Sequence, residues 1–242
     1  MEKNIPRYSP SSLEVAQEIA VTPADEMDTA DRWTQETSAT LELLRGLQSP
    51  TSVRDIIDFG TGPGRLLPGL LSDFPLSRIV SIDTSQAMLD FARNAVPPEM
   101  RSRVRFARYT GIEDLELTAA EDSADLAVAV YVLQHVAQAV LPAVISFLHS
   151  RLREGGSLFV INLYVRAVPL IQESELDPAE RDAAIHNVAT KMTPHGQAWV
   201  DDGVDVRAML RRSFTDERAL DLPESGFSAS IRHRHFCTVY RK

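Results

Sequence analysis

The residues best placed to do chemistry are Gly60, Gly62 and Gly64, three glycines spaced two apart between two apolar segments. The segment before them, 53–59, has the residues of a buried strand, and the segment after them, 65–71, has leucines at helical spacing. Glycine permits positive φ angles and a close backbone approach, and the start of a helix directs free N–H groups at a ligand. The pattern predicts a strand, a tight turn and a helix that bind a nucleotide-like cofactor.

The spacing of the glycines narrows the kind of nucleotide. The dinucleotide fingerprint GxGxxG would need a glycine at position 65, where this chain has Arg65. Asp58 stands two residues before the first glycine and is expected to order the loop. A tight strand-to-helix connection without a ligand is the alternative interpretation of these glycines.

The segment DFGTGPG, 58–64, resembles the first motif of class I S-adenosylmethionine-dependent methyltransferases, in which the glycine loop carries the amino-acid end of the cofactor. Three later segments are similar to further motifs of this superfamily, in the right order: IDTSQAMLDFAR, SADLAVAVYVLQHV and LREGGSLFVIN. The resemblance covers about 55–162. It implies S-adenosyl-L-methionine as cofactor, S-adenosyl-L-homocysteine as product, and an α/β fold that is Rossmann-like. The alternation of strands and helices independently predicts a parallel sheet with right-handed crossovers.

The expected sheet has seven mostly parallel strands with helices on both faces. We expect an N-terminal helical cap over 1–50, a cofactor-binding core over 51–165, a helical insertion after strand five over 166–215, and terminal strands over 216–242 that complete the sheet. Leucines 41, 43, 44 and 47 are expected to pack on the sheet. Gly155 and Gly156 are expected to stop the crossover helix that precedes strand five.

Asp83 ends a predicted strand, 79–83, about 20 residues beyond the glycines, where an acidic side chain in this architecture accepts hydrogen bonds from a ribose diol. An ordinary helix N-cap is the alternative for this residue. The resemblance implies adenine contacts from Thr84 and Met88. It implies others from the loop after the third strand, although Ile112 follows Gly111 where the family carries an acid. The full set of expected cofactor contacts is Asp58, Gly60, Thr61, Gly62, Gly64, Asp83, Thr84, Met88, Ile112, Glu113, Tyr131 and Gln134.

One histidine lies among the cofactor motifs. His135 follows the apolar strand 125–132, at the carboxyl end where open α/β sheets place their ligands. Its neutral imidazole could take a proton from an acceptor, and a structural role is the alternative.

Composition excludes several classes of partner. The chain has 242 residues, a net charge of −9 and one cysteine. We therefore expect no nucleic-acid partner, since phosphate binding needs clustered Lys and Arg, and no disulfide. No apolar run has the length of a membrane span or of a signal core, so we expect no membrane association and a cytoplasmic protein. No metal site is expected: a solvated, helix-capping loop is preferred for Asp201, Asp202 and Asp205, and a solvated strand face for His233 and His235.

Together these features predict an S-adenosylmethionine-dependent methyltransferase that acts on an oxygen or nitrogen atom of a small molecule by in-line transfer. Its acceptor is expected to contact Trp33, His195 and Trp199, in the cap and the insertion. A non-catalytic S-adenosylmethionine-binding module is the first alternative. A nicotinamide-dependent oxidoreductase is the second, and Arg65 counts against it.

Overall fold

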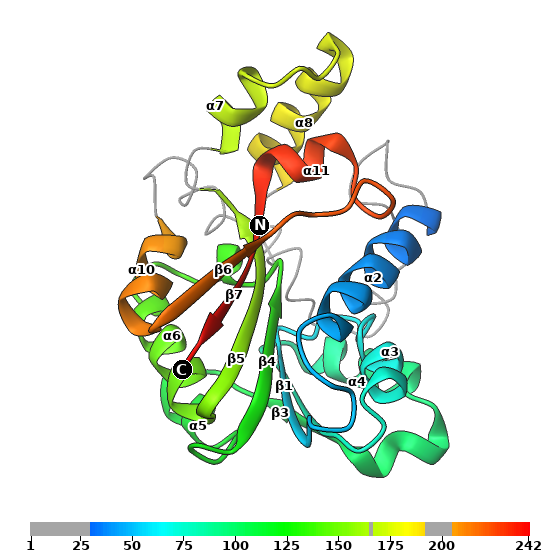
Figure 1. The fold of residues 1–242 in the computed structure, drawn as a ribbon, viewed down its shortest axis with the longest axis vertical. Coiled ribbons are helices and arrows are strands. Elements are labelled where there is room, and N and C mark those ends of the chain that lie inside the picture. The colour runs from blue at the N-terminus through cyan, green and yellow to red at the C-terminus, as the bar shows by residue number, and fades with distance from the viewer. Residues whose placement is uncertain (1–29, 165–166, 192–204) are drawn as a thin grey trace, which may run out of the picture.

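The protein is described here by a computed structural model, which covers residues 30–164, 167–191 and 205–242. These residues form a seven-stranded sheet in the order β3-β2-β1-β4-β5-β7-β6, with helices on both faces (Figure 1). Five strands run parallel: β1 (Asp55–Phe59), β2 (Arg78–Asp83), β3 (Val104–Arg108), β4 (Ala124–Val130) and β5 (Leu152–Leu163). Strand β7 (His235–Arg241) is antiparallel to β5 and to β6 (Asp216–Leu220). The expected fold class is confirmed.

The strand order reverses between β1 and β4. The chain adds β2 and β3 on one side of β1, and it then crosses to place β4 and β5 on the other side. Loops that leave the carboxyl ends of β1 and β4 therefore diverge, and in open α/β sheets ligands bind at this point.

Apolar side chains cover both faces of the sheet. Within β1, Ile56 belongs to one buried cluster and Ile57 to the other, because successive side chains of a strand point to opposite faces. One cluster includes side chains of α2 (Ala30–Arg45), α3 (Leu67–Asp73), α4 (Gln86–Ala95) and α11 (Ala229–Arg234). The other includes side chains of α5 (Ile112–Glu116), α6 (Leu141–Arg151) and α10 (Val206–Ser213).

Helix α2 packs closely on its neighbours. Leu41 and Leu44 are buried in the same cluster as Ile56, and Leu43 and Leu47 pack against that cluster, so the predicted apolar face is confirmed. Gly69 makes the approach possible, since a Cβ there would lie 2.1 Å from Leu41 Cδ1. This packing fixes α2 against the helix that follows the glycine loop.

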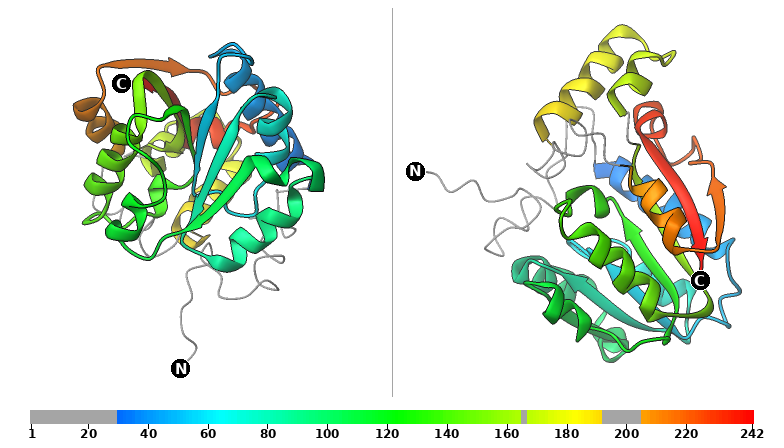
Figure 2. Two further views of the ribbon diagram at one scale, coloured as in Figure 1. Left: turned by 90° about the horizontal axis from the view of Figure 1, so that it is seen from below. Right: turned by 90° about the vertical axis from the view of Figure 1, so that its left-hand side faces the viewer.

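A second group of helices stands over the carboxyl ends of the central strands. Helices α7 (Ala167–Gln172) and α8 (Pro178–Lys191) pack with α11 above the sheet (Figure 1), and the right-hand view of Figure 2 shows the same arrangement. Their contact is apolar, with Ile171 and Val188 buried in it. Asp177 Oδ1 accepts the N–H groups of Ala179 (2.9 Å) and Glu180 (3.0 Å), and it thereby caps the start of α8. The proposed division at 50, 165 and 215 places these two helices in the insertion.

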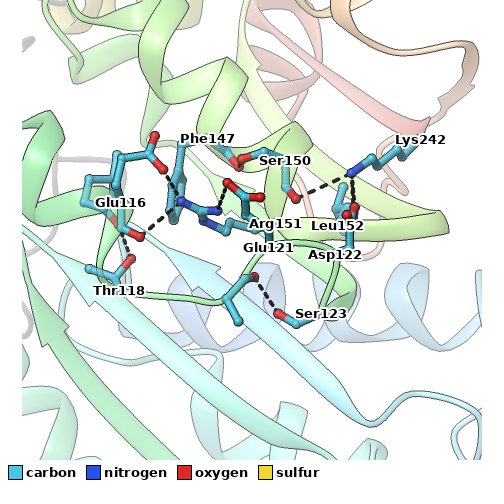
Figure 3. Close-up of polar contacts among 12 residues, drawn as sticks. Glu116, Thr118, Glu121, Asp122, Ser123, Phe147, Ser150, Arg151, Leu152 and Lys242 are labelled. Atoms are coloured by element: carbon cyan, nitrogen blue, oxygen red, sulfur yellow. Dashed lines mark hydrogen bonds and ion pairs between the residues drawn. The ribbon is translucent and has the colours of Figure 1, made fainter.

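Ion pairs hold the opposite edge of the sheet together (Figure 3). The buried Arg151 pairs with Glu116 and with Glu121, the latter at 3.2 Å. Lys242 Nζ pairs with Asp122 and donates to Leu152 O at 2.7 Å. These contacts lie at the amino ends of β4 and β5, away from the glycine loop, and they serve the fold.

Two local expectations are wrong. Helix α6 ends at Arg151, ahead of Gly155 and Gly156, and both glycines lie inside β5. Gly155 has φ of 73° in the segment of β5 where the pairing with β4 shifts register, so the glycines serve a strand irregularity rather than a helix end. His233 lies in α11 and not on a strand, so it does not share a strand face with His235.

Two short 3₁₀ segments complete the elements, η1 (Pro98–Arg103) and η2 (Leu133–His135). Within the described ranges, no helix has the length and apolar character that crossing a membrane requires.

Candidate functional site

The glycine loop begins at the carboxyl end of β1. Gly60, Gly62 and Gly64 have φ angles of 71°, 52° and 78°, values that residues with a side chain rarely adopt. The backbone N–H groups of Gly60 and Thr61 both donate to Ile82 O, at 2.8 and 3.1 Å. The loop is thereby fixed to the end of β2.

The three glycines serve different purposes. A Cβ at Gly60 would lie 2.1 Å from Val132 Cγ2, and one at Gly64 would lie 2.7 Å from Ala92 Cβ. These two glycines are needed so that the chain can pack against itself. A Cβ at Gly62 would meet nothing within 4 Å. Gly62 is therefore the glycine in this loop whose surroundings leave room for a ligand.

Gly62→Ala is expected to weaken cofactor binding, because the new methyl group occupies the space that the ligand's approach to the backbone requires. The positive φ adds a strain of about 1 to 2 kcal/mol to the free energy of folding. Gly155→Ala is the matched control, since Gly155 has φ of 73° and equally open surroundings at the other end of the molecule. Calorimetric titration and thermal unfolding should show similar destabilisation in both variants but weaker binding only in Gly62→Ala. Equal affinities would place the cofactor elsewhere.

Asp83 joins the glycine loop to the turn after β2. Its Oδ2 accepts the N–H of Gly62 and its Oδ1 accepts the N–H of Ser85, both at 2.9 Å. Burial raises the pKa of this carboxyl group, and backbone N–H donors oppose the rise. The N-cap of α4 is Ser85, whose Oγ accepts from Met88 N at 3.2 Å, so Asp83 does not act as that cap.

Asp58 lies buried at the start of the loop. Its Oδ2 accepts the hydroxyl of Thr61 at 2.6 Å, which orders the loop as expected. Burial raises the pKa of Asp58 to about 6, the Thr61 hydroxyl lowers it, nearby Asp83 raises it, and Arg65 lowers it. Two buried carboxyl groups therefore flank Gly62.

The residues expected near an adenine lie on three elements. Thr84 is exposed directly after β2, and Met88 is buried on α4 beside Ala87. Ile112 is half-buried at the start of α5, and Glu113 next to it is exposed. Their contacts with a cofactor stay predictions.

The segment after β4 contains the other predicted residues. Tyr131 has φ of 57°, a strained value for a residue with a side chain, and such strain is concentrated at functional sites. Gln134 is buried, and its Oε1 accepts the N–H of Leu163 at 3.0 Å, which holds the end of β5. His135 is half-buried at the end of η2. The structure thus brings Tyr131 beside Arg65 at the end of the glycine loop, and it places His135 at the carboxyl end of β4.

The residues expected to bind an acceptor are only partly described. Trp33 lies half-buried on α2, with its ring beside Arg65. His195 and Trp199 fall outside the described residues.

Arg65 and Glu36 belong to this site, and the sequence analysis gave neither of them a role there. Arg65 Nη1 lies 3.7 Å from Glu36 Oε2, and the Tyr131 hydroxyl lies 3.4 Å from the same oxygen. The position of Arg65 directly after the last glycine was the signal available for it. Glu36 gives no such signal, because its contact depends on how α2 packs.

S-Adenosylmethionine fits these residues. Gly62 leaves open space at the loop, and Asp83 has a carboxylate at the adjacent strand end. Asp58 supplies a second acid, near the loop that would hold the amino-acid end. This combination, at the point where the strand order reverses, suits a cofactor with a ribose and a charged amino-acid group.

Comparisons with known proteins agree with this assignment. Residues 56–156 match the methyltransferase domain family. Trans-aconitate 2-methyltransferase of Enterobacter sp. (strain 638) is 51% identical over 45 residues, 19% of this chain and 18% of that protein. The structure of a candidate O-methyltransferase from Nostoc punctiforme PCC 73102 superposes with a TM-score of 0.63 at 16% identity, over 93% of this chain and 60% of that chain. N-methyltransferase NodS from Bradyrhizobium japonicum WM9, in complex with S-adenosyl-L-homocysteine, gives a TM-score of 0.57 at 14% identity, over 96% and 99%.

Residues 56–156 thus match a methyltransferase domain, and the seven-stranded fold around them is that of class I S-adenosylmethionine-dependent methyltransferases, whose cofactor is S-adenosylmethionine. The chain spans less than two thirds of the length of the trans-aconitate and Nostoc relatives. The structural likeness, at these identities, establishes the fold.

Proposed function

We propose that the protein transfers the methyl group of S-adenosylmethionine to an oxygen or nitrogen atom of a small molecule. The observation that carries the proposal is the open Gly62 beside the Asp83 carboxylate, where the strand order reverses. The open glycine and the carboxylate together, at that point of the sheet, favour a ligand site over a simple tight turn.

The protein's own residues act mainly by binding and alignment. When bound, the cofactor supplies an electrophilic methyl group on a sulfonium. Asp83 holds the ribose, and Gly62 admits the amino-acid end. Tyr131 and α2 border the place where an acceptor would lie in line with the methyl group. His135 is the proposed proton acceptor, and the pH profile of kcat for His135→Gln tests that role; an unchanged profile rejects it.

A small-molecule acceptor is supported by charge. The net charge of −9 disfavours nucleic-acid binding, which depends on clustered basic residues. The relatives include both an O- and an N-methyltransferase, so both acceptor atoms remain in the proposal. A cytoplasmic location is part of it too, supported by a single cysteine, Cys237, whose thiol is buried.

The test begins with binding. The protein is expected to bind S-adenosylmethionine and S-adenosylhomocysteine in calorimetry, and not the nicotinamide cofactors, since Arg65 replaces the third fingerprint glycine. A panel of small carboxylic acids, alcohols, phenols and amines is then screened for S-adenosylhomocysteine formation. Nicotinamide binding without S-adenosylmethionine binding would reject the proposal. Cofactor binding without turnover on any acceptor would favour the non-catalytic module.

A further inference from the structure

One cation at the site lies between two aromatic rings. The guanidinium carbon of Arg65 is 5.1 Å from the centre of the Trp33 ring and 5.5 Å from that of Tyr131. Trp33 comes from α2 and Tyr131 from the segment after β4, so three separate parts of the chain build this arrangement. Aromatic faces on two sides restrict the planar guanidinium and fix the direction of its N–H groups.

The hydrogen-bonding capacity of Arg65 is hardly used within the described part of the chain. Its ion pair with Glu36 has a separation of 3.7 Å, which is beyond hydrogen-bonding distance, and no described residue accepts a hydrogen bond from it. Only 17% of the Arg65 side chain and 6% of the Glu36 side chain are exposed. A guanidinium has five N–H donors, so a nearly buried one that makes no such bond is suited to a ligand.

The position of Arg65 indicates which ligand atoms lie within its reach. It directly follows Gly64, at the end of the loop that holds the amino-acid part of the cofactor, and its charge acts on Asp58. On the other side lies Tyr131, at the edge where an acceptor would approach. Planar guanidinium groups bind carboxylates through two parallel hydrogen bonds, which gives both strength and orientation.

We propose that Arg65, held between Trp33 and Tyr131, is the carboxylate-binding group of this site, and that Glu36 occupies it until a ligand carboxylate arrives. The inference rests on the proposed function. Two carboxylates have the required chemistry: that of the cofactor's methionine part and that of a carboxylic acid acceptor.

The experiment measures binding by calorimetry to the full chain and to Arg65→Gln. The probes are S-adenosylhomocysteine, 5′-methylthioadenosine, which lacks the amino-acid end, and trans-aconitate added to protein saturated with S-adenosylhomocysteine. If the cofactor supplies the carboxylate, Arg65→Gln binds S-adenosylhomocysteine about ten- to hundredfold more weakly and 5′-methylthioadenosine equally well. If the acceptor supplies it, only trans-aconitate binding is lost.

Matched variants separate binding from folding. Arg65→Lys retains the charge without the planar donors and should regain part of the lost affinity. Arg78→Gln is the control, because Arg78 pairs with Asp55 at 3.0 Å, is 77% exposed and lies at the amino end of β2. Glu36→Gln removes the internal competitor, so it should tighten binding by roughly tenfold. If the Arg65–Glu36 ion pair only holds α2 in place, Glu36→Gln would instead lower the thermal stability and leave the affinity for S-adenosylhomocysteine unchanged.

The outcomes distinguish two failures. An unaltered protein that binds no S-adenosylhomocysteine overturns the proposed function. Suppose that the unaltered protein binds S-adenosylhomocysteine and that Arg65→Gln binds it equally well. The role of Arg65 is then overturned if the variant also binds trans-aconitate equally well, or if the unaltered protein binds no trans-aconitate at all.

Discussion

Asp83→Ala is expected to bind S-adenosylmethionine roughly a hundredfold more weakly, or worse, than the unaltered protein. Hydrogen bonds to a charged group contribute about 1.5 to 3 kcal/mol each, and a ribose diol offers two hydroxyl donors. A carboxylate has about four lone-pair sites, and the backbone N–H groups of Gly62, Ser85 and Thr84 act on this one. The ribose is expected to use the acceptor capacity that these donors leave.

The substitution also acts on the loop itself. Without the carboxylate, the N–H of Gly62 loses its acceptor, so the glycine loop loses a link to β2. Lower affinity in Asp83→Ala would therefore combine a lost ribose contact with a less ordered loop. Thermal unfolding without ligand measures the second contribution alone.

Asp125→Ala is the matched control for this prediction. Asp125 is also a buried strand aspartate, and its Oδ2 accepts two backbone N–H groups, from Arg54 at 2.6 Å and Asp55 at 2.9 Å. It lies at the amino end of β4, at the opposite edge of the sheet. The Asp125→Ala variant should be less stable, with little change in its affinity for S-adenosylmethionine. Equal affinity losses in the two variants would show that the effect of Asp83 is structural.

The central sheet and the glycine loop could be predicted because their signals are local. Buried parallel strands are short apolar runs, as in β4, where residues 124–129 are all buried. The glycine spacing identified the turn, and Asp83 followed from the order of elements. The sequence left open whether Asp83 was a helix cap, and the bond from Met88 N to Ser85 Oγ resolves this.

Short elements were harder to predict. The segment 229–234 alternates residues as a strand does, yet it forms α11, where Ser228 Oγ accepts the N–H of Ile231 at 3.4 Å. A helix of six residues is too short to show its own periodicity against that alternation. Gly155 and Gly156 look like a helix stop in the sequence, and only the register of β4 against β5 reveals the strand irregularity.

The least predictable part of the site is the group around Arg65. Its members, Trp33, Glu36, Arg65 and Tyr131, come from three elements and meet only because α2 packs on α3. No spacing in the sequence encodes that contact. The close approach depends on Gly69, where a side chain would collide with Leu41. Cofactor motifs are therefore readable, while contacts made by the cap depend on tertiary packing.

Asp58→Asn is expected to stabilise the ligand-free protein at pH 8 by about 3 kcal/mol and to leave its stability nearly unchanged at pH 4. Burial raises the pKa of Asp58 from 3.8 to about 6. Well below pH 3.8 the group is protonated in both folded and unfolded chains, so its burial does not alter the free energy of unfolding. Between pH 4 and pH 6 only the unfolded chain ionises, and the folded state loses stability as the pH rises. Above pH 6 the full penalty remains, and asparagine removes it.

Binding should change in the opposite direction. An ionised Asp58 attracts the positively charged amino group of S-adenosylmethionine, so the affinity of the unaltered protein should rise as the pH increases through about 6. The asparagine variant should lack this rise and bind more weakly at pH 8.

Denaturant unfolding and calorimetry at pH 4.5, 6 and 8 measure the stability and the affinity of the Asp58→Asn variant, with the exposed Asp216→Asn as control. A variant that is no more stable at pH 8 would show that Asp58 ionises without penalty. If the affinities of the unaltered protein and of Asp58→Asn changed with pH in the same way, Asp58 would have no part in recognising the amino group. Together, higher stability and weaker binding would show that this buried acid is retained for the ligand at the expense of the fold.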